Sequence, residues 1–386
     1  MFKILIIDDD PIVRVALKRT LQNQGYDTTV ASNGQAGITQ AKILRPALII
    51  CDWVMSEMDG LEVCRQVKED SNLATTFFIL LTAKGAAPGE EGDRVRGLDA
   101  GADEFVSKPI EMNELKARVR AGLRLYQLNQ DLKNKQIALE KLNQNLEAEL
   151  AEAADYVRSL LPSPLVGTVT TEALFVPSAQ LGGDCFDYYW IDDDNLAIYL
   201  LDVSGHGVGS ALLSMSVLNV LRSQSLPNTN FCHPGEVLKA LNHSFQMSSH
   251  GNKYFTIWYG VYNQLTHQLI YANAGHPPAV LIDQDAKNIN QLSSLDLPIG
   301  FVPDIDFTVD ILEIADNSTL YLFSDGAYEV LQADGRLWGF NAFFDLLIHC
   351  TQVNICSLQQ ILAQIKNLST TTTFDDDLSL LKVTFN

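Results

Sequence analysis

The sequence lacks the features that mark zinc-finger, secreted, membrane or nucleic-acid-binding proteins. Its six cysteines form no CxxC pair, so we expect reduced thiols and no zinc site. No apolar run reaches membrane-spanning length and no signal peptide precedes the first strand-like run, so we expect a cytoplasmic protein. Residues 162–386 hold 23 acidic and 7 basic residues, a net charge of −16, which disfavours nucleic acid as a partner.

The 386 residues suit two domains and a connector better than one core. Changes in the hydrophobic pattern predict domains at 1–122 and 162–386, joined by a helical segment at 123–161. The first domain alternates short apolar runs with amphipathic segments, which indicates a doubly wound parallel sheet of the flavodoxin-like kind. Its predicted strands are Ile4–Ile7, Ala47–Cys51, Phe77–Leu81 and Asp103–Val106.

Polar residues follow the predicted strands of the first domain. Asp8, Asp9 and Asp10 follow the first strand, Asp52 follows the second, and Thr82 and Lys108 follow the next two. Parallel strands of such a sheet place their functional residues at the carboxyl ends. Clustered carboxylates bind Mg²⁺, one aspartate can act as a nucleophile toward phosphorus, and a lysine and a hydroxyl can hold phosphoryl oxygens.

This pattern resembles the receiver domain of two-component response regulators. The matching motifs are Ile6-Ile7-Asp8-Asp9, Asp52-Trp53-Val54-Met55, Met58-Asp59-Gly60, Leu81-Thr82-Ala83 and Ser107-Lys108-Pro109. The resemblance implies that a sensor histidine kinase phosphorylates Asp52. It also implies one Mg²⁺ on Asp8, Asp9, Asp52 and the carbonyl of Val54, phosphoryl contacts from Thr82 and Lys108, and a switching aromatic at Phe105. Ser56 stands where the family has proline, and the segment Lys84–Asp93 is longer than usual.

A helical pattern runs from about Glu111 to Leu161. Leucines recur in steps of 3 and 4, with Lys135 as one polar position: Leu125, Leu128, Leu132, Leu139, Leu142 and Leu146. This heptad repeat predicts a coiled coil and hence a homodimer. The alternative is one amphipathic helix that packs on its own domain.

Residues 165–386 group strands apart from helices, which predicts an antiparallel α+β sandwich. Four acidic motifs lie beside glycines or strand ends: Gly182-Gly183-Asp184, Asp202-Val203-Ser204-Gly205-His206-Gly207, Ser324-Asp325-Gly326 and Asp375-Asp376-Asp377. Glycine lets the backbone approach a metal closely, and scattered aspartates are ligands that Mg²⁺ or Mn²⁺ prefers.

These motifs resemble the metal-dependent serine/threonine protein phosphatases, in their bacterial sporulation and stress-response branch. Asn273-Ala274-Gly275-His276-Pro277-Pro278 and Leu297-Pro298-Ile299-Gly300 match further signatures of the family. The resemblance implies one-step hydrolysis of phosphoserine or phosphothreonine with two Mn²⁺ or Mg²⁺ ions. Catalytic metal ligands would be Asp184, Asp202 with the Val203 carbonyl, Asp325 and Asp376, and Asp377 is the alternative to its neighbour.

Further expectations about the second domain concern its two histidines, the binding of the substrate phosphate and the substrate itself. His206 either acts as an acid or holds its loop, and the second role is favoured; His276 is expected to brace a turn. No basic residue adjoins the acidic motifs in sequence, so the metals alone would bind the substrate phosphate. The resemblance implies an anti-sigma-factor antagonist as the phosphoprotein substrate. The competing hypothesis is a phosphorylation-gated adaptor with an inactive phosphatase fold.

Overall fold

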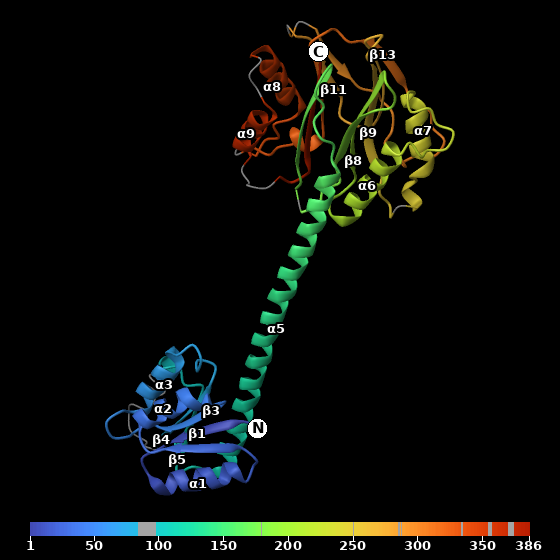
Figure 1. The fold of residues 1–386 in the computed structure, drawn as a ribbon. Helices are drawn as coiled ribbons and strands as arrows, with labels where there is room; N and C mark the ends of the chain where they lie inside the picture. The colour runs from blue at the N-terminus through green and yellow to red at the C-terminus, as the bar shows by residue number, and fades with distance from the viewer. Residues whose placement is uncertain are drawn as a thin grey trace. The chain divides into compact units, whose positions relative to one another are not determined.

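The computed structural model describes residues 1–83, 98–178, 180–249, 251–284, 286, 288–332, 335–353, 357–369 and 374–386. It contains two compact units, residues 1–144 and 145–386, and the division falls inside one long helix. Each unit is described by itself (Figure 1). The segment Lys84–Asp93, which the sequence marks as unusually long, lies outside the described residues.

The first unit is a five-stranded parallel sheet in the order β2-β1-β3-β4-β5. Its elements are β1 Lys3–Ile7, α1 Pro11–Gln22, β2 Asp27–Ala31, α2 Gly34–Leu44, β3 Leu48–Asp52, α3 Gly60–Glu69, β4 Phe77–Ala83, β5 Glu104–Lys108 and the start of α5 Met112–Leu160. The central strand β3 is buried along its whole length. This arrangement confirms the doubly wound parallel sheet.

Helices cover both faces of this sheet, as its apolar strands require. Ile38 of α2 and Val63 of α3 pack with Leu5 and Ile49 on one face. Leu17 of α1 and Leu115 of α5 pack with Ile4, Ile50 and Leu81 on the other. The sheet is therefore the middle of three layers (Figure 1).

Helix α5 is continuous over 49 residues and includes the predicted heptad segment. The predicted seam residues are exposed in the single chain, and their exposed fractions are 49% for Leu125, 67% for Leu132, 57% for Leu139 and 48% for Leu146. In the described part of the chain, no helix is long and apolar enough to cross a membrane.

The second unit has two five-stranded antiparallel sheets, β13-β10-β9-β8-β7 and β12-β11-β14-β15-β6. Its strands are β6 Val169–Val176, β7 Cys185–Trp190, β8 Asn195–Val203, β9 Phe255–Asn263, β10 Gln268–Ala274, β11 Ala279–Ile282, β12 Ile289–Leu292, β13 Val309–Glu313, β14 Ser318–Phe323 and β15 Leu378–Phe385. Its helices are α6 Val208–Arg222, α7 Pro234–Ser244, α8 Phe340–Val353 and α9 Leu358–Leu368, with short 3₁₀ turns η1 Met247–Ser249 and η2 Asp325–Ala327.

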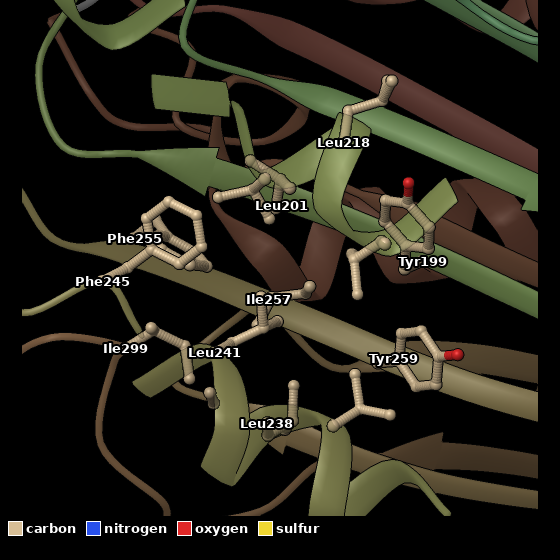
Figure 2. Close-up of a cluster of buried hydrophobic side chains, with 14 of the residues drawn as sticks. Tyr199, Leu201, Leu218, Leu238, Leu241, Phe245, Phe255, Ile257, Tyr259 and Ile299 are labelled. Atoms are coloured by element: carbon tan, nitrogen blue, oxygen red, sulfur yellow. The ribbon is translucent and has the colours of Figure 1, made fainter. Parts of the chain in front are cut away.

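Three hydrophobic cores stack through this unit. The core between the sheets includes Ile198, Trp258, Leu320 and Leu381. A second core lies under α6 and α7, where Tyr199 stacks on Tyr259 at 5.9 Å between ring centroids (Figure 2). A third core lies under α8 and α9. The second unit is therefore a β-sandwich with helices on both outer faces, which confirms the predicted antiparallel sandwich.

Candidate functional site

In the first unit, the ends of neighbouring strands bring the predicted acidic residues together. Asp8 follows β1 and is fully buried, and Asp52 ends β3 with an exposed fraction of 7%. The third aspartate of the run, Asp10, accepts a hydrogen bond from the amide of Ile12 and caps α1. Of the three consecutive aspartates, Asp8 therefore belongs to the acidic cluster and Asp10 caps a helix.

Lys108 at the end of β5 inserts its ammonium group between the two buried carboxylates. Its Nζ lies 2.9 Å from Oδ2 of Asp52 and 3.2 Å from Oδ2 of Asp8. Burial raises the pKa of Asp52, and the hydrogen bond from Lys108 acts in the opposite direction. The pKa of Lys108 is raised, because the two aspartates outweigh the effect of its burial. The chain itself thus supplies part of the counter-charge.

The remaining predicted receiver residues surround this cluster. Thr82 follows the β4 residue that pairs with Asp52, and it pairs with Ser107 of β5. The ring of Phe105 is half-buried, 6.4 Å from the ring of Trp53. Val54 has an exposed side chain directly beyond β3. The roles that the sequence resemblance implies for these residues stay predictions.

Ligand atoms of Asp8, Asp9 and Asp52 all lie within 4.8 Å of one another. Within the described residues, this is the one group of three acidic, histidine or cysteine side chains that is so close. Carboxylate oxygens at this spacing suit one hard cation such as Mg²⁺.

In the second unit, the four predicted aspartates come from both sheets. Asp184 precedes β7 and Asp202 lies near the end of β8, in the first sheet. Asp325 follows β14 and Asp376 precedes β15, in the second sheet. Gly183 donates a hydrogen bond to Asp377, 194 residues away, and so joins the two loops. The structure therefore assembles the four motifs at one end of the sandwich.

Three of these carboxyl groups have raised pKa values. Burial and the charge of Asp202 raise the pKa of Asp184. Burial, Asp325 and Asp376 raise that of Asp202 to about 7, and burial, Asp376 and Glu329 raise that of Asp325 to about 6. Buried carboxylates that face one another are destabilised by their mutual repulsion unless protons or cations neutralise them.

The hydrogen-bonding state of the carboxylates fits metal ligation. Both side-chain oxygens of Asp184 and Oδ1 of Asp325 are buried and have no hydrogen-bond partner within the described structure. Such groups cost free energy unless a partner compensates them. Oxygen ligands of this kind suit Mg²⁺ or Mn²⁺, so the residues present fit the metals that the resemblance implies.

Asp377 differs from its neighbour Asp376. Its Oδ1 accepts hydrogen bonds from the amide and hydroxyl of Ser178 at 2.8 and 3.0 Å, and Oδ2 accepts one from Gly183. Asp376 is exposed and accepts a hydrogen bond from the amide of Asp377. A Cβ at Gly183 would lie 2.8 Å from the Val203 carbonyl, and one at Gly326 would lie 2.2 Å from that of Asp377. The glycines thus permit close packing of the loops that Asp377 joins.

The two histidines have different surroundings. His276 is buried, its Nδ1 lies 2.8 Å from the hydroxyl of Thr256, and its backbone amide and carbonyl both bond Asn273. Burial lowers its pKa to about 3, so the ring is neutral and braces the turn. His206 is exposed, and within the described residues its ring makes no hydrogen bond. The loop-holding role that the sequence favoured for His206 therefore has no support.

One basic residue that is distant in sequence from the acidic motifs lies close to one of them in the structure. Lys253, two residues before the start of β9, donates hydrogen bonds to the carbonyl of Ser204 at 3.2 Å and the hydroxyl of Ser210 at 2.9 Å. The pairing of β8 with β9 brings this residue to the loop after Asp202. No local sequence pattern indicates this contact, because it spans 49 residues.

Comparison with known proteins agrees with these two units. The response regulator receiver domain model matches residues 4–120, and the model "Stage II sporulation protein E (SpoIIE)" matches residues 192–386. The SiaA-PP2C domain of Pseudomonas aeruginosa superposes with a TM-score of 0.55 at 19% identity, over 64% of this chain and 99% of that one. The second unit therefore has the PP2C-type fold.

Two curated relatives match one unit each. The DNA-binding response regulator MtrA of Mycolicibacterium smegmatis is 40% identical over 122 residues, 32% of this chain and 50% of MtrA. Phosphoserine phosphatase RsbP of Bacillus subtilis is 34% identical over 194 residues, 49% of this chain and 47% of RsbP. The chain thus spans about half the length of the curated relatives it matches. It belongs to the stage II sporulation protein E family and carries an N-terminal receiver domain.

Proposed function

We propose that the second unit is a metal-dependent phosphatase that removes phosphate from serine or threonine of a protein. The observation that carries this proposal is the buried Asp184 carboxylate without a partner, beside Asp202 and Asp325 with raised pKa values. The similarity to a protein named as a phosphoserine phosphatase supports the substrate class.

Asp184, Asp202, Asp325 and Asp376 are the proposed ligands of two Mn²⁺ or Mg²⁺ ions, together with the carbonyl of Val203. When bound, such a pair supplies a water of lowered pKa and positive charge opposite the phosphoryl oxygens. Asp377 holds the loops that carry these ligands, because both of its oxygens already accept hydrogen bonds. The two sheets hold these aspartates in place, so the metal ions would sit at fixed positions opposite the phosphoryl oxygens.

The direct test is hydrolysis of a phosphoserine peptide and of p-nitrophenyl phosphate in Mn²⁺, Mg²⁺ or EDTA. We expect activity that requires metal and is lost in Asp202→Ala. An inactive wild type with every metal, even with a phosphodonor for the receiver, contradicts the proposal and favours the alternative, an adaptor with an inactive phosphatase fold.

The first unit is proposed to accept a phosphoryl group on Asp52 from a sensor histidine kinase, with one Mg²⁺ on Asp8, Asp9, Asp52 and the Val54 carbonyl. Lys108 already lies within hydrogen-bond distance of Asp52, and Thr82 lies on the adjacent strand end. Phe105 is the proposed switching side chain. Acetyl phosphate with Mg²⁺ should phosphorylate the wild type but not Asp52→Asn, as followed by intact-protein mass spectrometry.

The proposed substrate is a phosphorylated anti-sigma-factor antagonist. This substrate is what the resemblance to the sporulation and stress-response branch implies, and the similarity to a protein named as a phosphoserine phosphatase supports its phosphoserine part. Candidate antagonists phosphorylated on serine can be compared with an unrelated phosphoserine protein. A rate constant kcat/KM that is no higher for the antagonists contradicts this part of the proposal.

Helix α5 is the proposed connection between receiver state and phosphatase. In the second unit, Ala154 and Val157 of α5 pack against Leu181, next to the Asp184 motif, and against Ala211 of α6. A change in the position of α5 therefore reaches the loop that carries a proposed metal ligand. The exposed leucines of its heptad support a coiled-coil homodimer.

The dimer can be tested by sedimentation of the full chain. Leu132→Lys with Leu139→Lys should give a monomer, because two charges at seam positions oppose helix pairing. Asn134→Lys, outside the seam, is the matched control and should stay dimeric. A wild type that is monomeric at all concentrations contradicts the coiled coil.

A further inference from the structure

The loop between β8 and α6 connects a proposed metal site to a helix, and its Gly207 amide donates a hydrogen bond to the Leu181 carbonyl at 3.2 Å. It begins directly after Asp202 and Val203 and has glycine at positions 205 and 207, and Gly209 follows in the first turn of α6. Gly205 and Gly207 have positive φ angles of 78° and 87°, and Gly207, at the start of α6, provides no side-chain cap. Such a glycine-rich segment has much conformational entropy to lose when it is ordered.

Lys253 closes this loop with a triangle of hydrogen bonds. Its Nζ donates to the Ser204 carbonyl at 3.2 Å and to the Ser210 hydroxyl at 2.9 Å, and that hydroxyl donates to the same carbonyl at 3.3 Å. Ser210 is fully buried on α6, whereas Ser204 follows β8. One side chain thus joins the two ends of the loop.

The residue after Lys253, Tyr254, also holds the end of β8 through backbone hydrogen bonds. Tyr254 donates to the Ser204 hydroxyl at 3.1 Å and accepts from the Ser204 amide at 2.9 Å. The next residue, Phe255, pairs with Val203 but exchanges its backbone hydrogen bonds with Ile299 instead. The Val203 carbonyl faces Gly183 on the opposite side. Its direction therefore depends on how Ser204 is held.

The charge of Lys253 has no carboxylate partner within 4.0 Å in the described part of the chain, although residues 162–386 carry a net charge of −16. The ammonium group instead bonds a backbone carbonyl and a hydroxyl. A charged donor makes stronger hydrogen bonds than a neutral one, which suits a contact that orders a flexible loop.

We propose that Lys253 is a positioning residue that closes the Ser204–Ser210 loop and so fixes Asp202 and the Val203 carbonyl for a divalent cation. This inference rests on the proposed metal centre. Groups that hold metal ligands in place typically change metal affinity about 10- to 100-fold when they are removed.

The test compares the EDTA-stripped full chain with Lys253→Met, Lys253→Arg and Ser210→Ala. Calorimetric titration with Mn²⁺ should show a Kd for the phosphatase unit about 10-fold weaker in Lys253→Met. Lys253→Arg, which keeps a charged donor, should restore part of the affinity, and Ser210→Ala should lose less than Lys253→Met. Lys239→Met is the control, because Lys239 pairs with Asp306 on the exposed surface.

Hydrogen exchange in EDTA provides a readout without metal. Amides of residues 204–211 should exchange faster in Lys253→Met than in the wild type, while those of β11 and β14 stay unchanged. A structural role elsewhere would lower the melting temperature in EDTA without changing the exchange of this loop.

Wild-type Mn²⁺ affinity and wild-type exchange in Lys253→Met would overturn the inference. A raised KM for the phosphopeptide with unchanged Mn²⁺ affinity would also overturn it, because that pattern assigns Lys253 to substrate binding. A wild-type phosphatase unit that binds no Mn²⁺ would instead overturn the proposed function, while the exchange result would still test the loop closure.

Discussion

The two units each gather aspartates at strand ends, but they balance the negative charge in different ways. In the receiver, Lys108 lies within 3.2 Å of both Asp8 and Asp52. In the phosphatase unit, burial and neighbouring carboxylates raise the pKa values of Asp184, Asp202 and Asp325. The receiver cluster has Lys108 as an internal counter-ion, whereas the phosphatase cluster needs bound protons or cations to balance its negative charge.

This difference matches the chemistry proposed for each site. A receiver must accept one phosphoryl group and release it, so one ion and one lysine suffice to hold the added charge. A hydrolase must neutralise charge and also activate water, which two metal ions can do together. The lysine that the phosphatase unit does bring close, Lys253, bonds the loop and not the carboxylates.

The largest expected effect is on kcat, when one aspartate of each cluster is replaced by asparagine. Asp184→Asn should lower kcat for a phosphoserine peptide on the order of 10³-fold, because it removes a metal ligand. Asp52→Asn, the matched change in the receiver, should leave hydrolysis by the unphosphorylated chain unchanged. Equal losses in both variants would contradict the division of roles.

A second pair of variants separates adjacent aspartates. Asp376→Asn should lower kcat about 100-fold with little change in stability in EDTA. Asp377→Ala should destabilise the unit by about 2 kcal/mol, because it leaves buried amides of Ser178 and Gly183 unpaired. Urea unfolding and steady-state kinetics measure the two effects, and the reverse pattern would make Asp377 the ligand.

The raised pKa values predict a pH dependence in EDTA. Asp202, with a pKa of about 7, keeps a proton in the folded state at pH values where the unfolded chain has lost it. Its stabilising contribution is full below about pH 4 and is lost as the pH rises through about 7. The melting temperature of this unit should therefore fall about 5 °C between pH 5 and 8.

Asp202→Asn is the control for this pH dependence, because an amide does not titrate. Its melting temperature in EDTA should exceed that of the wild type at pH 8, and saturating Mn²⁺ should remove the wild type's loss. A wild-type melting temperature that rises from pH 5 to 8 in EDTA would be inconsistent with protonated carboxyl groups in this cluster.

The smallest expected effect comes from removing the receiver's own counter-ion. Lys108→Met should make the receiver cluster resemble the phosphatase cluster, because Asp8 and Asp52 then face each other unpaired. In EDTA, the receiver transition should fall about 3 °C more between pH 5 and 8 than in the wild type. Differential scanning calorimetry can follow it, and an identical slope in both proteins would deny Lys108 this role.

Local sequence signals predicted the chemical motifs better than the edges of the fold. The central strands and one edge strand, β5, were visible as apolar runs, but the other edge strands, β2, β6, β7, β12 and β13, were not indicated. An edge strand has one free side and can carry more polar residues, and β13 is mostly exposed. This reason does not apply to β7, which is largely buried. The aspartates predicted for the two sites stand out in the sequence because glycines and strand ends accompany them.

Other site features depend on contacts between distant segments. Asp376 and Asp377 are adjacent and chemically identical, and only the hydrogen bonds from Ser178 and Gly183 distinguish them. The position of Lys253 follows from the register of β8 and β9. Neither feature has a local pattern in the sequence.

The most direct test of the account is calorimetric titration of the EDTA-stripped full chain with Mn²⁺. We expect the wild type to bind one ion that is lost in Asp52→Asn and two further ions that are lost in Asp202→Asn. Binding that disappears entirely in Asp52→Asn would show that the phosphatase unit holds no metal, and would contradict the proposed enzyme.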